Sequence, residues 1–314
     1  MKPSLSPSQS LAARITRNAS KQTYYTIRLL VDRKMVADAY RAYAYFRWVD
    51  DVQDAPGASC TEKQAFLERQ AALLEACYQG PPSMQVSSEE QMLVELVGNN
   101  READSGLQTY LRWMMEVMRF DTRRCGSPVS QVELSEYTRN LAVAVSAALC
   151  YFIGHQTGGA AQQEWIMAVS AAHIIHMLRD TQEDLRAGYF NIPAEVILQN
   201  GLDMQDLDWS ALRAWVQSRV ELAHHYFKAG RQGIGRERCL RRCLAGYAYV
   251  ARFEWMIKII RKDGYRLQTD YSRRRSPQAG LWMAWRLLGS LVVLPRQKGE
   301  ENSLERHSLR VNGR

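Results

Sequence analysis

The stretch ELSEYTRNLAVAVSAALCYFIGH, residues 133–155, decides the fold class, because it is apolar on nearly every side between Leu141 and Ile153. A surface helix carries its apolar side chains on one stripe, so a run that is apolar all round indicates a central, buried helix. No alternating strand pattern and no hairpin dipeptide competes with helices elsewhere in the chain. The sequence therefore predicts an all-α protein.

The helical pattern continues on both sides of this stretch. We expect further helices over residues 35–51, 61–80, 89–100, 106–121, 161–188, 208–230 and 237–264. Gly80-Pro81-Pro82 ends the second of these, and Gly264 ends the last. The two ends of the chain are polar. We expect a flexible N-terminus over residues 1–18, one helical domain over residues 19–295 and a flexible C-terminus over residues 296–314.

The composition is that of a water-soluble globular protein of 314 residues, with 46% hydrophobic residues and a formal charge of +8. An excess of positive charge suits nucleic acid, an anionic membrane surface or a phosphorylated substrate. No zinc-finger spacing, RNA-binding signature or Gly-rich phosphate loop is present, so we expect no nucleic-acid partner. The six cysteines are scattered in apolar contexts and are typical of buried, reduced thiols.

The N-terminus begins MKPSLSPSQS and lacks the apolar segment of a secretory signal, so we expect a cytoplasmic protein. No stretch reaches the roughly 18 to 20 apolar residues that a membrane span needs. Residues 281–294, LWMAWRLLGSLVVL, are too short to cross a membrane but are flanked by Arg273, Arg274, Arg275 and Arg296. Two interpretations stay open: the segment lies in a membrane interface, or it packs onto the bundle.

Two pairs of aspartates have a spacing of four residues. Asp50 and Asp54 lie in YFRWVDDVQD, residues 45–54, and Asp180 and Asp184 lie in HMLRDTQEDLRAG, residues 176–188. Residues four apart share one helix face, and two carboxylates that close repel each other. Each pair also ends an apolar helical stretch, where unpaired charge is very unfavourable. We therefore expect a cation between the two carboxylates of each pair.

Mg²⁺ is the cation that this donor set favours, because it takes oxygen ligands and usually keeps positions for substrate phosphates. Two facing helices that each contribute one pair would hold a diphosphate through Mg²⁺ ions. A single D-x-x-x-D is common on solvated helix faces. Two copies, each with an arginine upstream (Arg47 and Arg179), favour the metal–diphosphate interpretation.

With these two motifs in this order, about 130 residues apart in an all-α chain, the sequence resembles the squalene/phytoene synthase family. The resemblance covers roughly residues 15–270 and includes SKQTYYTIRLLVDRKMVADAYRAYAYFRWVDDVQD and MLRDTQEDLRAG. It implies the isoprenoid-synthase fold, a single bundle of helices around a central apolar cavity. It also implies an enzyme that joins two prenyl diphosphates head to head, with Mg²⁺ assisting the departure of diphosphate. An apolar, aromatic-lined cavity would then keep water from the allylic cation.

The resemblance implies roles for particular residues of this chain. Four carboxylates would bind Mg²⁺: Asp50, Asp54, Asp180 and Asp184. Three residues fall where the family contacts diphosphate: Arg47, Arg179 and Tyr43. Tyr24 falls near the substrate site of the first motif. The hydroxyl of Tyr137 would lie near the reacting carbons and the departing diphosphate.

Three positions of the site depart from the family pattern. His173 and His176 stand where the family usually has glutamine and asparagine, and Asn191 stands where it often has tyrosine. His176 lies one helical turn before Asp180, so we expect both histidines to face the substrate, as diphosphate donors or as a general base. Satisfied core histidines are the alternative. We expect Asn191 to contact the substrate as well.

These departures concern the carbon chemistry that follows the loss of diphosphate more than the loss of diphosphate itself. They leave three hypotheses for the function of the protein. The first is head-to-head condensation of two farnesyl or geranylgeranyl diphosphates, with NADPH involved if the product is reduced. The second keeps the fold and the metal chemistry in a terpene cyclase, or in a prenyltransferase to a non-isoprenoid acceptor. The third is a non-catalytic assembly or binding protein. Four mutually repelling carboxylates argue against the third, because binding alone does not need them.

Overall fold

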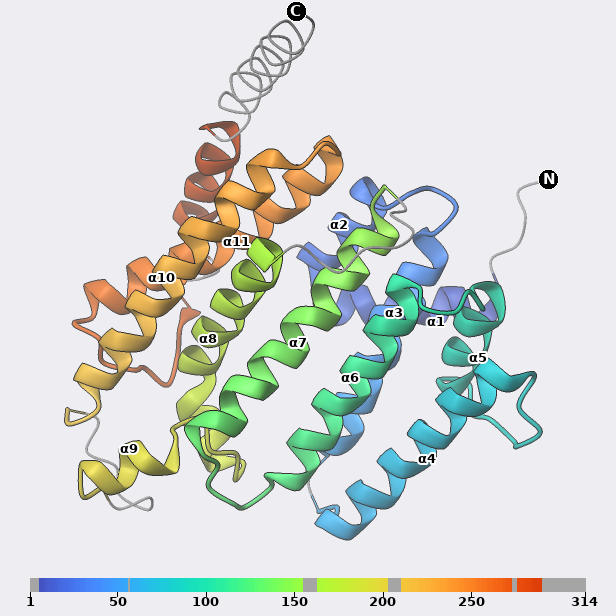
Figure 1. Ribbon diagram of the computed structural model, residues 1–314, viewed down its shortest axis with the longest axis horizontal. Coiled ribbons are helices and arrows are strands. Elements are labelled where there is room, and N and C mark those ends of the chain that lie inside the picture. Colours follow the sequence, from blue (N-terminus) through green and yellow to red (C-terminus); the bar gives the residue numbers. More distant parts are fainter. Residues whose placement is uncertain (1–5, 56, 155–162, 203–209, 273–275, 290–314) are drawn as a thin grey trace, which may run out of the picture. The chain divides into compact units, whose positions relative to one another are not determined.

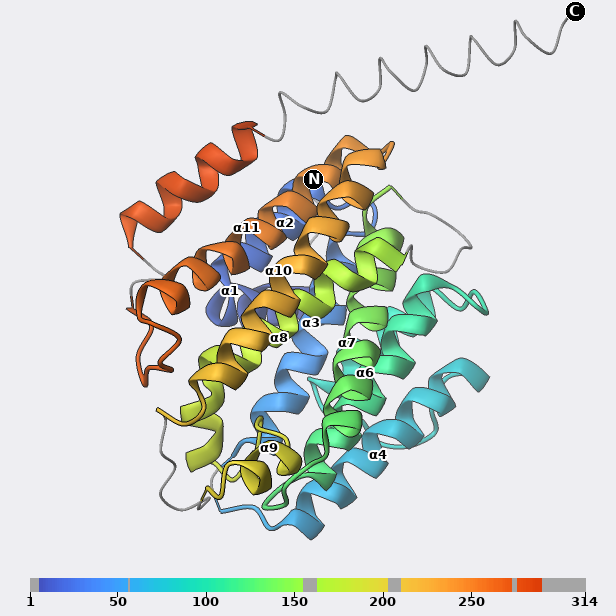
Figure 2. The same cartoon turned by 60° about the vertical axis from the view of Figure 1, so that its left-hand side comes forward.

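The structure is a computed structural model that describes residues 6–55, 57–154, 163–202, 210–272 and 276–289. Every regular element within these residues is a helix (Figures 1 and 2), as the sequence predicts. The elements are α1 (Pro7–Ala19), α2 (Lys21–Leu30), α3 (Val36–Gln53), α4 (Cys60–Gln79), α5 (Glu90–Asn99), α6 (Gly106–Arg123), α7 (Gln131–Phe152), α8 (Gln163–Arg186), α9 (Ala194–Gln199), α10 (Arg213–Arg236) and α11 (Leu240–Lys262).

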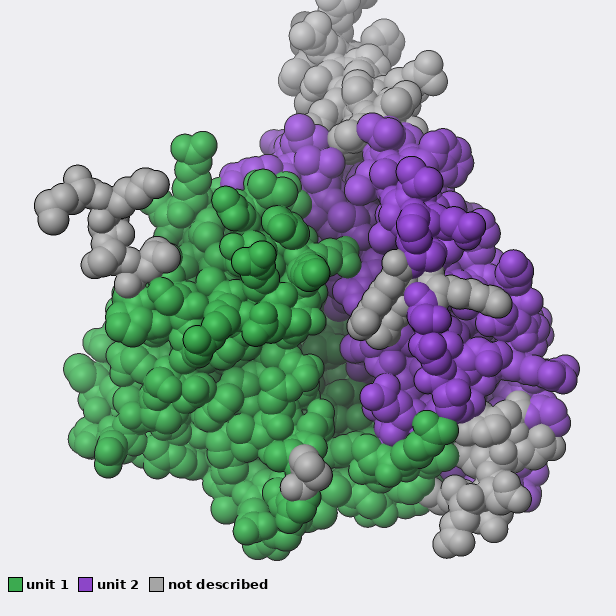
Figure 3. Space-filling model, turned by 180° about the vertical axis from the view of Figure 1, so that it is seen from behind, with its two compact units in different colours: residues 1–161, 185–194 green, residues 162–184, 195–314 purple. Residues whose placement is uncertain are grey.

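The chain divides into two compact units, coloured separately in Figure 3. Unit 1 contains residues 1–161 and 185–194, and unit 2 contains residues 162–184 and 195–314. The two units alternate along the sequence, because α8 belongs to unit 2 up to Asp184 while the segment after it returns to unit 1. Each unit is described below by itself.

Helix α7 is the expected buried helix of unit 1. No side chain from Leu141 to Ile153 is exposed, which confirms the prediction from its apolar composition. The helix begins at a capping box, in which Ser130 accepts from the backbone N–H of Glu133 and the Glu133 carboxylate accepts from the backbone N–H of Ser130. Helix α6 lies along α7. Gly106 allows this approach, because an added Cβ would lie 3.1 Å from the carbonyl oxygen of Ala147.

The expectation of a flexible N-terminus is wrong for residues 7–18. These residues form most of α1, which begins with Ser6 as its N-cap and packs against α3. Ala12 and Thr16 of this helix are fully buried. The prediction failed because α1 is mostly polar, and its anchoring depends on a polar network with distant helices. The expected flexible C-terminus, residues 296–314, lies outside the described residues.

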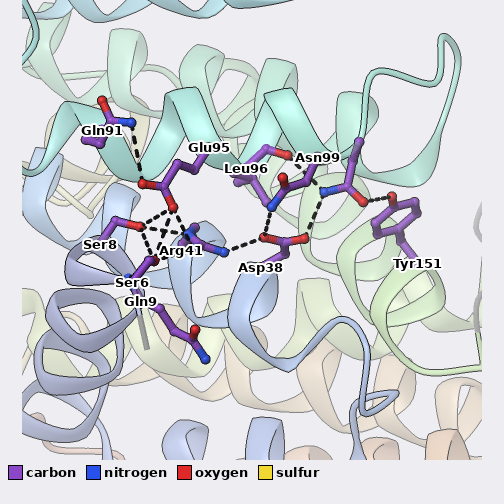
Figure 4. Close-up of polar contacts among 11 residues, drawn as sticks. Ser6, Ser8, Gln9, Asp38, Arg41, Gln91, Glu95, Leu96, Asn99 and Tyr151 are labelled. Carbon is purple, nitrogen blue, oxygen red and sulfur yellow. Dashed lines mark hydrogen bonds and ion pairs between the residues drawn. The ribbon is translucent and has the colours of Figure 1, made fainter. Parts of the chain in front are cut away.

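The network that anchors α1 is centred on Arg41 of α3 (Figure 4). Its guanidinium donates to Asp38 at 2.7 Å, to Glu95 of α5 at 2.6 Å and to Ser8 of α1 at 3.0 Å. Its side chain is only 6% exposed. Ser8 also donates to Glu95 at 2.6 Å, so three helices share one set of charges. A buried arginine with this many charged partners contributes to stability only as long as all of them are present.

Unit 2 contains three long helices, α8, α10 and α11, which confirm the expected helices at 161–188, 208–230 and 237–264 to within a few residues. Glycines allow them to pack closely. A Cβ added at Gly230 of α10 would lie 2.5 Å from the Cβ of Ala168 in α8, and one at Gly246 of α11 would lie 2.6 Å from the ring of Trp165. A further helix over residues 277–289 follows α11.

None of the helices in the described part of the chain is long and apolar enough to cross a membrane. The six cysteines, all within the described residues, form no disulfide, and Cys77 and Cys243 are buried. Cys60, by contrast, is exposed, so the expectation of buried thiols is wrong there. Cys60 begins α4, where the first turn of the helix points toward solvent.

Candidate active site

The first aspartate pair lies at the C-terminal end of α3, where the helix leaves the core of unit 1. Asp50 is in the last turn, and Asp54 is the residue that caps it. Arg47, one turn earlier, donates to Asp50 at 2.9 Å and also pairs with Asp51. The helical spacing expected from the sequence therefore holds, and Arg47 already contacts one carboxylate of the pair.

The charges of this pair are only partly compensated. Burial and the neighbouring Asp54 carboxylate raise the pKa of Asp50 to about 7, although Arg47 acts in the opposite direction. Burial and the carboxylate of Asp121 raise the pKa of Asp54. Three carboxylates thus repel one another at the end of α3. The site has an excess of negative charge that a cation would relieve.

Asp121 is the third carboxylate, and it comes from the end of α6. Its side chain is 19% exposed and accepts hydrogen bonds from two residues. Oδ1 accepts from Nε of Arg124 at 2.8 Å, and Oδ2 accepts from the hydroxyl of Tyr137 at 2.9 Å. Burial raises the pKa of Asp121 in spite of these donors. Tyr137, which the family resemblance places near the reaction, therefore contacts the carboxylate whose charge raises the pKa of Asp54 in the first motif.

Arg124 lies at the centre of this cluster. It donates to Oδ1 of Asn191 at 2.8 Å, and its guanidinium lies over the rings of Tyr137 at 5.2 Å and Tyr189 at 5.4 Å. Asn191 is buried, with 4% of its surface exposed. The structure thus brings Asn191 to Asp121 through Arg124. Its expected contact with substrate stays a prediction.

A pocket of about 320 Å³ opens beside the cluster, between the end of α6 and the start of α7. Phe120, Arg124, Tyr137 and Asn140 are among the residues that line it. The rings of Phe120 and Tyr137 stack with centroids 4.8 Å apart. The Tyr137 side chain therefore has one face on Phe120 and its hydroxyl on Asp121.

The second aspartate pair lies in the last turns of α8, in unit 2. Nε2 of His176 lies 2.9 Å from Oδ2 of Asp180, and Arg179 forms a bidentate pair with the same carboxylate. Burial alone would raise the pKa of Asp180, but the hydrogen bonds from Arg179 and His176 hold it well below its usual range. Asp180 is thus ionised and fully compensated, in contrast to Asp50.

The two histidines of α8 have different surroundings. His173 is buried, with 6% of its surface exposed, whereas the His176 side chain is 49% exposed. Although half of the His176 side chain is exposed, desolvation of its ring by the surrounding protein lowers its pKa, and the hydrogen bond to Asp180 acts in the opposite direction. The structure thus confirms that His176 lies against Asp180, and the role of either histidine toward substrate stays a prediction.

The two remaining tyrosines of the predicted site lie in unit 1. Tyr24 of α2 stacks on Tyr40 with ring centroids 5.2 Å apart, and Arg17 lies over its ring. Tyr43 of α3 lies one helical turn before Arg47 and is close enough to raise the pKa of Arg47. Tyr43 is therefore next to the first motif, whereas Tyr24 contacts Arg17 of α1 and aromatic residues of α2 and α3.

The donor set of the first motif fits a hard divalent cation, because it offers carboxylate oxygens whose mutual repulsion is unrelieved. No three His, Cys, Asp or Glu side chains within the described ranges are arranged as a ready metal site. At the second motif, Arg179 pairs with Asp180 and His176 lies within hydrogen-bond distance of the same carboxylate. A cation at that pair would compete with these two side chains.

Asp121, Arg124 and Tyr189 are site residues that were not predicted from the sequence. One signal was present for Asp121. It follows Met114 by seven residues and Met118 by three, so it continues the buried face of α6. A carboxylate on an apolar face requires a partner, and that requirement indicates a functional or structural cluster. Arg124 and Tyr189 carried no such signal, because they lie just outside helices.

Comparison with known families identifies the chain. The family model described as squalene/phytoene synthase matches residues 16–279. The chain belongs to the squalene/phytoene synthase family. A search of curated proteins finds no match.

Solved structures agree with the family on the fold. The chain is similar to squalene synthase HpnC from Alicyclobacillus acidocaldarius, with 20% identity, a TM-score of 0.65 and coverage of 83% of this chain and 95% of that one. It is also similar to a dehydrosqualene synthase solved in complex with a ligand, with 17% identity, a TM-score of 0.69 and coverage of 92% and 97%. The isoprenoid-synthase fold expected from the sequence is confirmed.

Membership of the squalene/phytoene synthase family makes this protein a prenyltransferase-type enzyme. The family acts on prenyl diphosphates and generally uses a divalent metal to ionise the diphosphate. The family and the fold support head-to-head condensation as the reaction type.

Proposed function

We propose that this protein is a Mg²⁺-dependent synthase that condenses two farnesyl or geranylgeranyl diphosphates head to head and releases diphosphate. The observation that supports this most strongly is the carboxylate cluster at the end of α3. Asp50, Asp54 and Asp121 repel one another there with only partial compensation. A cluster of carboxylates that is only partly compensated is unfavourable in the free protein, and a cationic ligand would explain it.

In this proposal Asp50 and Asp54 hold Mg²⁺ at the first motif, and Asp180 and Asp184 hold it at the second. The metal would neutralise the negative charge that develops on the departing diphosphate. Arg47 and Arg179 lie beside the two pairs, where each guanidinium would bind diphosphate oxygens bidentately.

In this proposal, Tyr137 and the aromatic residues near it protect and stabilise the allylic cation. The allylic cation left by ionisation reacts with water unless its surroundings are apolar. The electron-rich faces of aromatic rings also attract a cation. The stacked rings of Phe120 and Tyr137 are suited to both effects.

Product analysis tests the proposal and separates it from the alternatives. Purified protein is incubated with C10, C15 and C20 prenyl diphosphates and Mg²⁺, with and without NADPH, and the products are identified by mass spectrometry. We expect a C30 or C40 product together with released diphosphate. A cyclic C15 or C20 product or an alcohol would instead show that the family chemistry ends as a cyclase or another transfer. If no substrate releases diphosphate, both enzymatic proposals fail.

We further propose that the protein is cytoplasmic and contacts membranes peripherally through residues 281–294, of which 281–289 belong to the helix at 277–289 and 290–294 lie outside the described residues. One face of this helix packs on α11, where Trp282 lies 5.5 Å from Trp255 and Arg286 donates to Glu254 at 2.8 Å. The other face is apolar and exposed. This face carries Leu281, Trp285 and Leu288, which are spaced four and three residues apart. They are 74%, 68% and 62% exposed, respectively. An apolar stripe with a tryptophan suits the interface of a lipid bilayer, where a water-insoluble product would be released.

We predict that replacing Leu281, Trp285 and Leu288 together with serine lowers co-sedimentation with vesicles of anionic lipid at least fivefold. The physical reason is the loss of apolar side chains that contribute roughly 1.5–3 kcal/mol each when buried. The matched control is Leu198→Ser, which removes an equally exposed leucine (79%) from α9 of the same unit. Equal binding by the triple variant and the wild type would contradict membrane contact through this helix.

A further inference from the structure

The hydroxyl of Tyr137 is held by a carboxylate whose two oxygens have different partners. Oδ2 of Asp121 accepts from Tyr137 at 2.9 Å. Oδ1 accepts from two nitrogens of Arg124, Nε at 2.8 Å and a terminal nitrogen at 2.7 Å. Because each oxygen is engaged by a separate donor, the plane of the carboxylate cannot rotate without breaking one of these contacts.

Arg124 is itself fixed from several directions. Asn191 accepts from its other terminal nitrogen at 2.8 Å, and the rings of Phe120, Tyr137 and Tyr189 lie between 5.2 and 5.7 Å from its guanidinium carbon. Only 8% of Arg124 is exposed. Asn191 thus has a definite contact in this chain, at a position where the sequence departs from the family's common tyrosine.

The orientation of the Tyr137 hydroxyl has a chemical consequence. Its proton points at Asp121, so its remaining lone pairs point elsewhere, and the bond to a carboxylate makes the oxygen more electron-rich. Burial and the Asp121 carboxylate raise the pKa of Tyr137 well above its ordinary value. The group is therefore a neutral phenol that donates to Asp121 and accepts on its other side.

We propose that Asp121 is a positioning residue that accepts the hydrogen bond of the Tyr137 hydroxyl and so directs the oxygen lone pairs toward the reacting carbons. Arg124, braced by Asn191, holds Asp121 in that orientation. This inference rests on the proposed function, because it assigns to Tyr137 a role toward a bound prenyl diphosphate. Asp121 itself acts only through Tyr137.

The isosteric variant Asp121→Asn tests this directly. Asparagine Oδ1 keeps the contact with Arg124, while its amide nitrogen faces the Tyr137 oxygen and reverses the direction of that hydrogen bond. We expect the kcat for diphosphate release to fall about tenfold and the KM for the prenyl diphosphate to stay within about twofold. Circular dichroism and the thermal midpoint would show an intact fold.

A double-mutant cycle separates positioning from other roles. In a Tyr137→Phe background, Asp121→Asn should lower kcat by less than about twofold, because the hydroxyl that it orients is absent. If Asp121→Asn lowers kcat by the same factor in both backgrounds, the inference is overturned. Asn191→Leu removes the acceptor for Arg124. This substitution should also lower kcat only while Tyr137 is present.

Two further arms complete the experiment. Recovery of Asp121→Asn turnover at about tenfold higher Mg²⁺ would place Asp121 among the metal ligands and overturn the positioning role. Glu68→Gln is the matched control, since it removes a carboxylate from an exposed residue of α4 that does not line this pocket. If the wild type releases no diphosphate from any prenyl diphosphate, the proposed function and this inference fail together. If the wild type is active and the double-mutant cycle is additive, this inference fails while the proposed function stands.

Discussion

Replacing Asp50 with asparagine should lower turnover by about three orders of magnitude. Asparagine retains the shape of the side chain but removes a charged metal ligand, and stabilisation of the departing diphosphate by metal contributes several kcal/mol. A loss of about 4 kcal/mol corresponds to about a thousandfold in rate. Diphosphate release under saturating substrate and Mg²⁺ measures the effect. Asp180→Asn should have a similar effect at the second motif.

The same substitution should stabilise the metal-free protein. Asp50 has a raised pKa because burial and Asp54 disfavour its charge, so the ionised carboxylate opposes folding near neutral pH. The Asp50 side chain is 39% exposed, and solvent screening reduces the gain to about 1–2 kcal/mol. We expect the thermal midpoint in a chelator to rise by a few degrees.

The matched control for both measurements is Glu68→Gln, which removes one negative charge from an exposed position on α4. It should leave turnover and thermal midpoint close to wild type. Full activity of Asp50→Asn would refute the assignment of Asp50 as a metal ligand. A lower thermal midpoint in the chelator would show that the carboxylate contributes to the fold instead.

Replacing Arg41 with methionine should lower the free energy of unfolding by about 3 kcal/mol. Methionine fills much of the volume but leaves Asp38 and Glu95 without their buried counter-ion, and breaking a buried ion pair from one side typically costs about 3–5 kcal/mol. Asn99 and Asn100 still donate to Asp38, which favours the lower end of that range. Urea unfolding followed by circular dichroism measures the change.

Arg112→Met is the control for this prediction. Arg112 pairs with Glu75 at 3.5 Å, and both side chains are more than half exposed, so its loss should change stability by less than about 1 kcal/mol. Equal effects of the two substitutions would show that burial of the Arg41 network is energetically unimportant.

The Arg41 network also predicts the direction of acid sensitivity. Burial would raise the pKa of Glu95, but Ser8 and Arg41 lower it below its ordinary value. A carboxyl group with a lowered pKa in the folded state contributes stability above its unfolded pKa, near 4.3. That contribution is lost as the pH falls through the folded value. Glu95→Gln should therefore be less stable than wild type at pH 7 and lose less of its stability on acidification. An identical pH dependence would contradict this.

The sequence by itself determined the features that depend on local periodicity. The apolar run in residues 133–155 has no polar face to expose, so it had to be a buried helix, and α7 is one. Asp50 and Asp54 share a face because helical geometry places every fourth residue there, and the same holds for Asp180 and Asp184. Such relations join residues only a few positions apart, so they can be predicted without knowledge of the rest of the fold.

Only the tertiary structure decided which distant residues meet. Asp121 holds Tyr137 from a neighbouring helix, and Asn191 reaches Arg124 across 67 positions of sequence. Helix α1 is ordered by Arg41 and Glu95, although its own composition predicts a loose end. Each of these contacts satisfies a buried polar group, and the sequence shows the need for a partner without showing which residue supplies it. That choice is made by packing, because the helices must be placed before their polar side chains can pair.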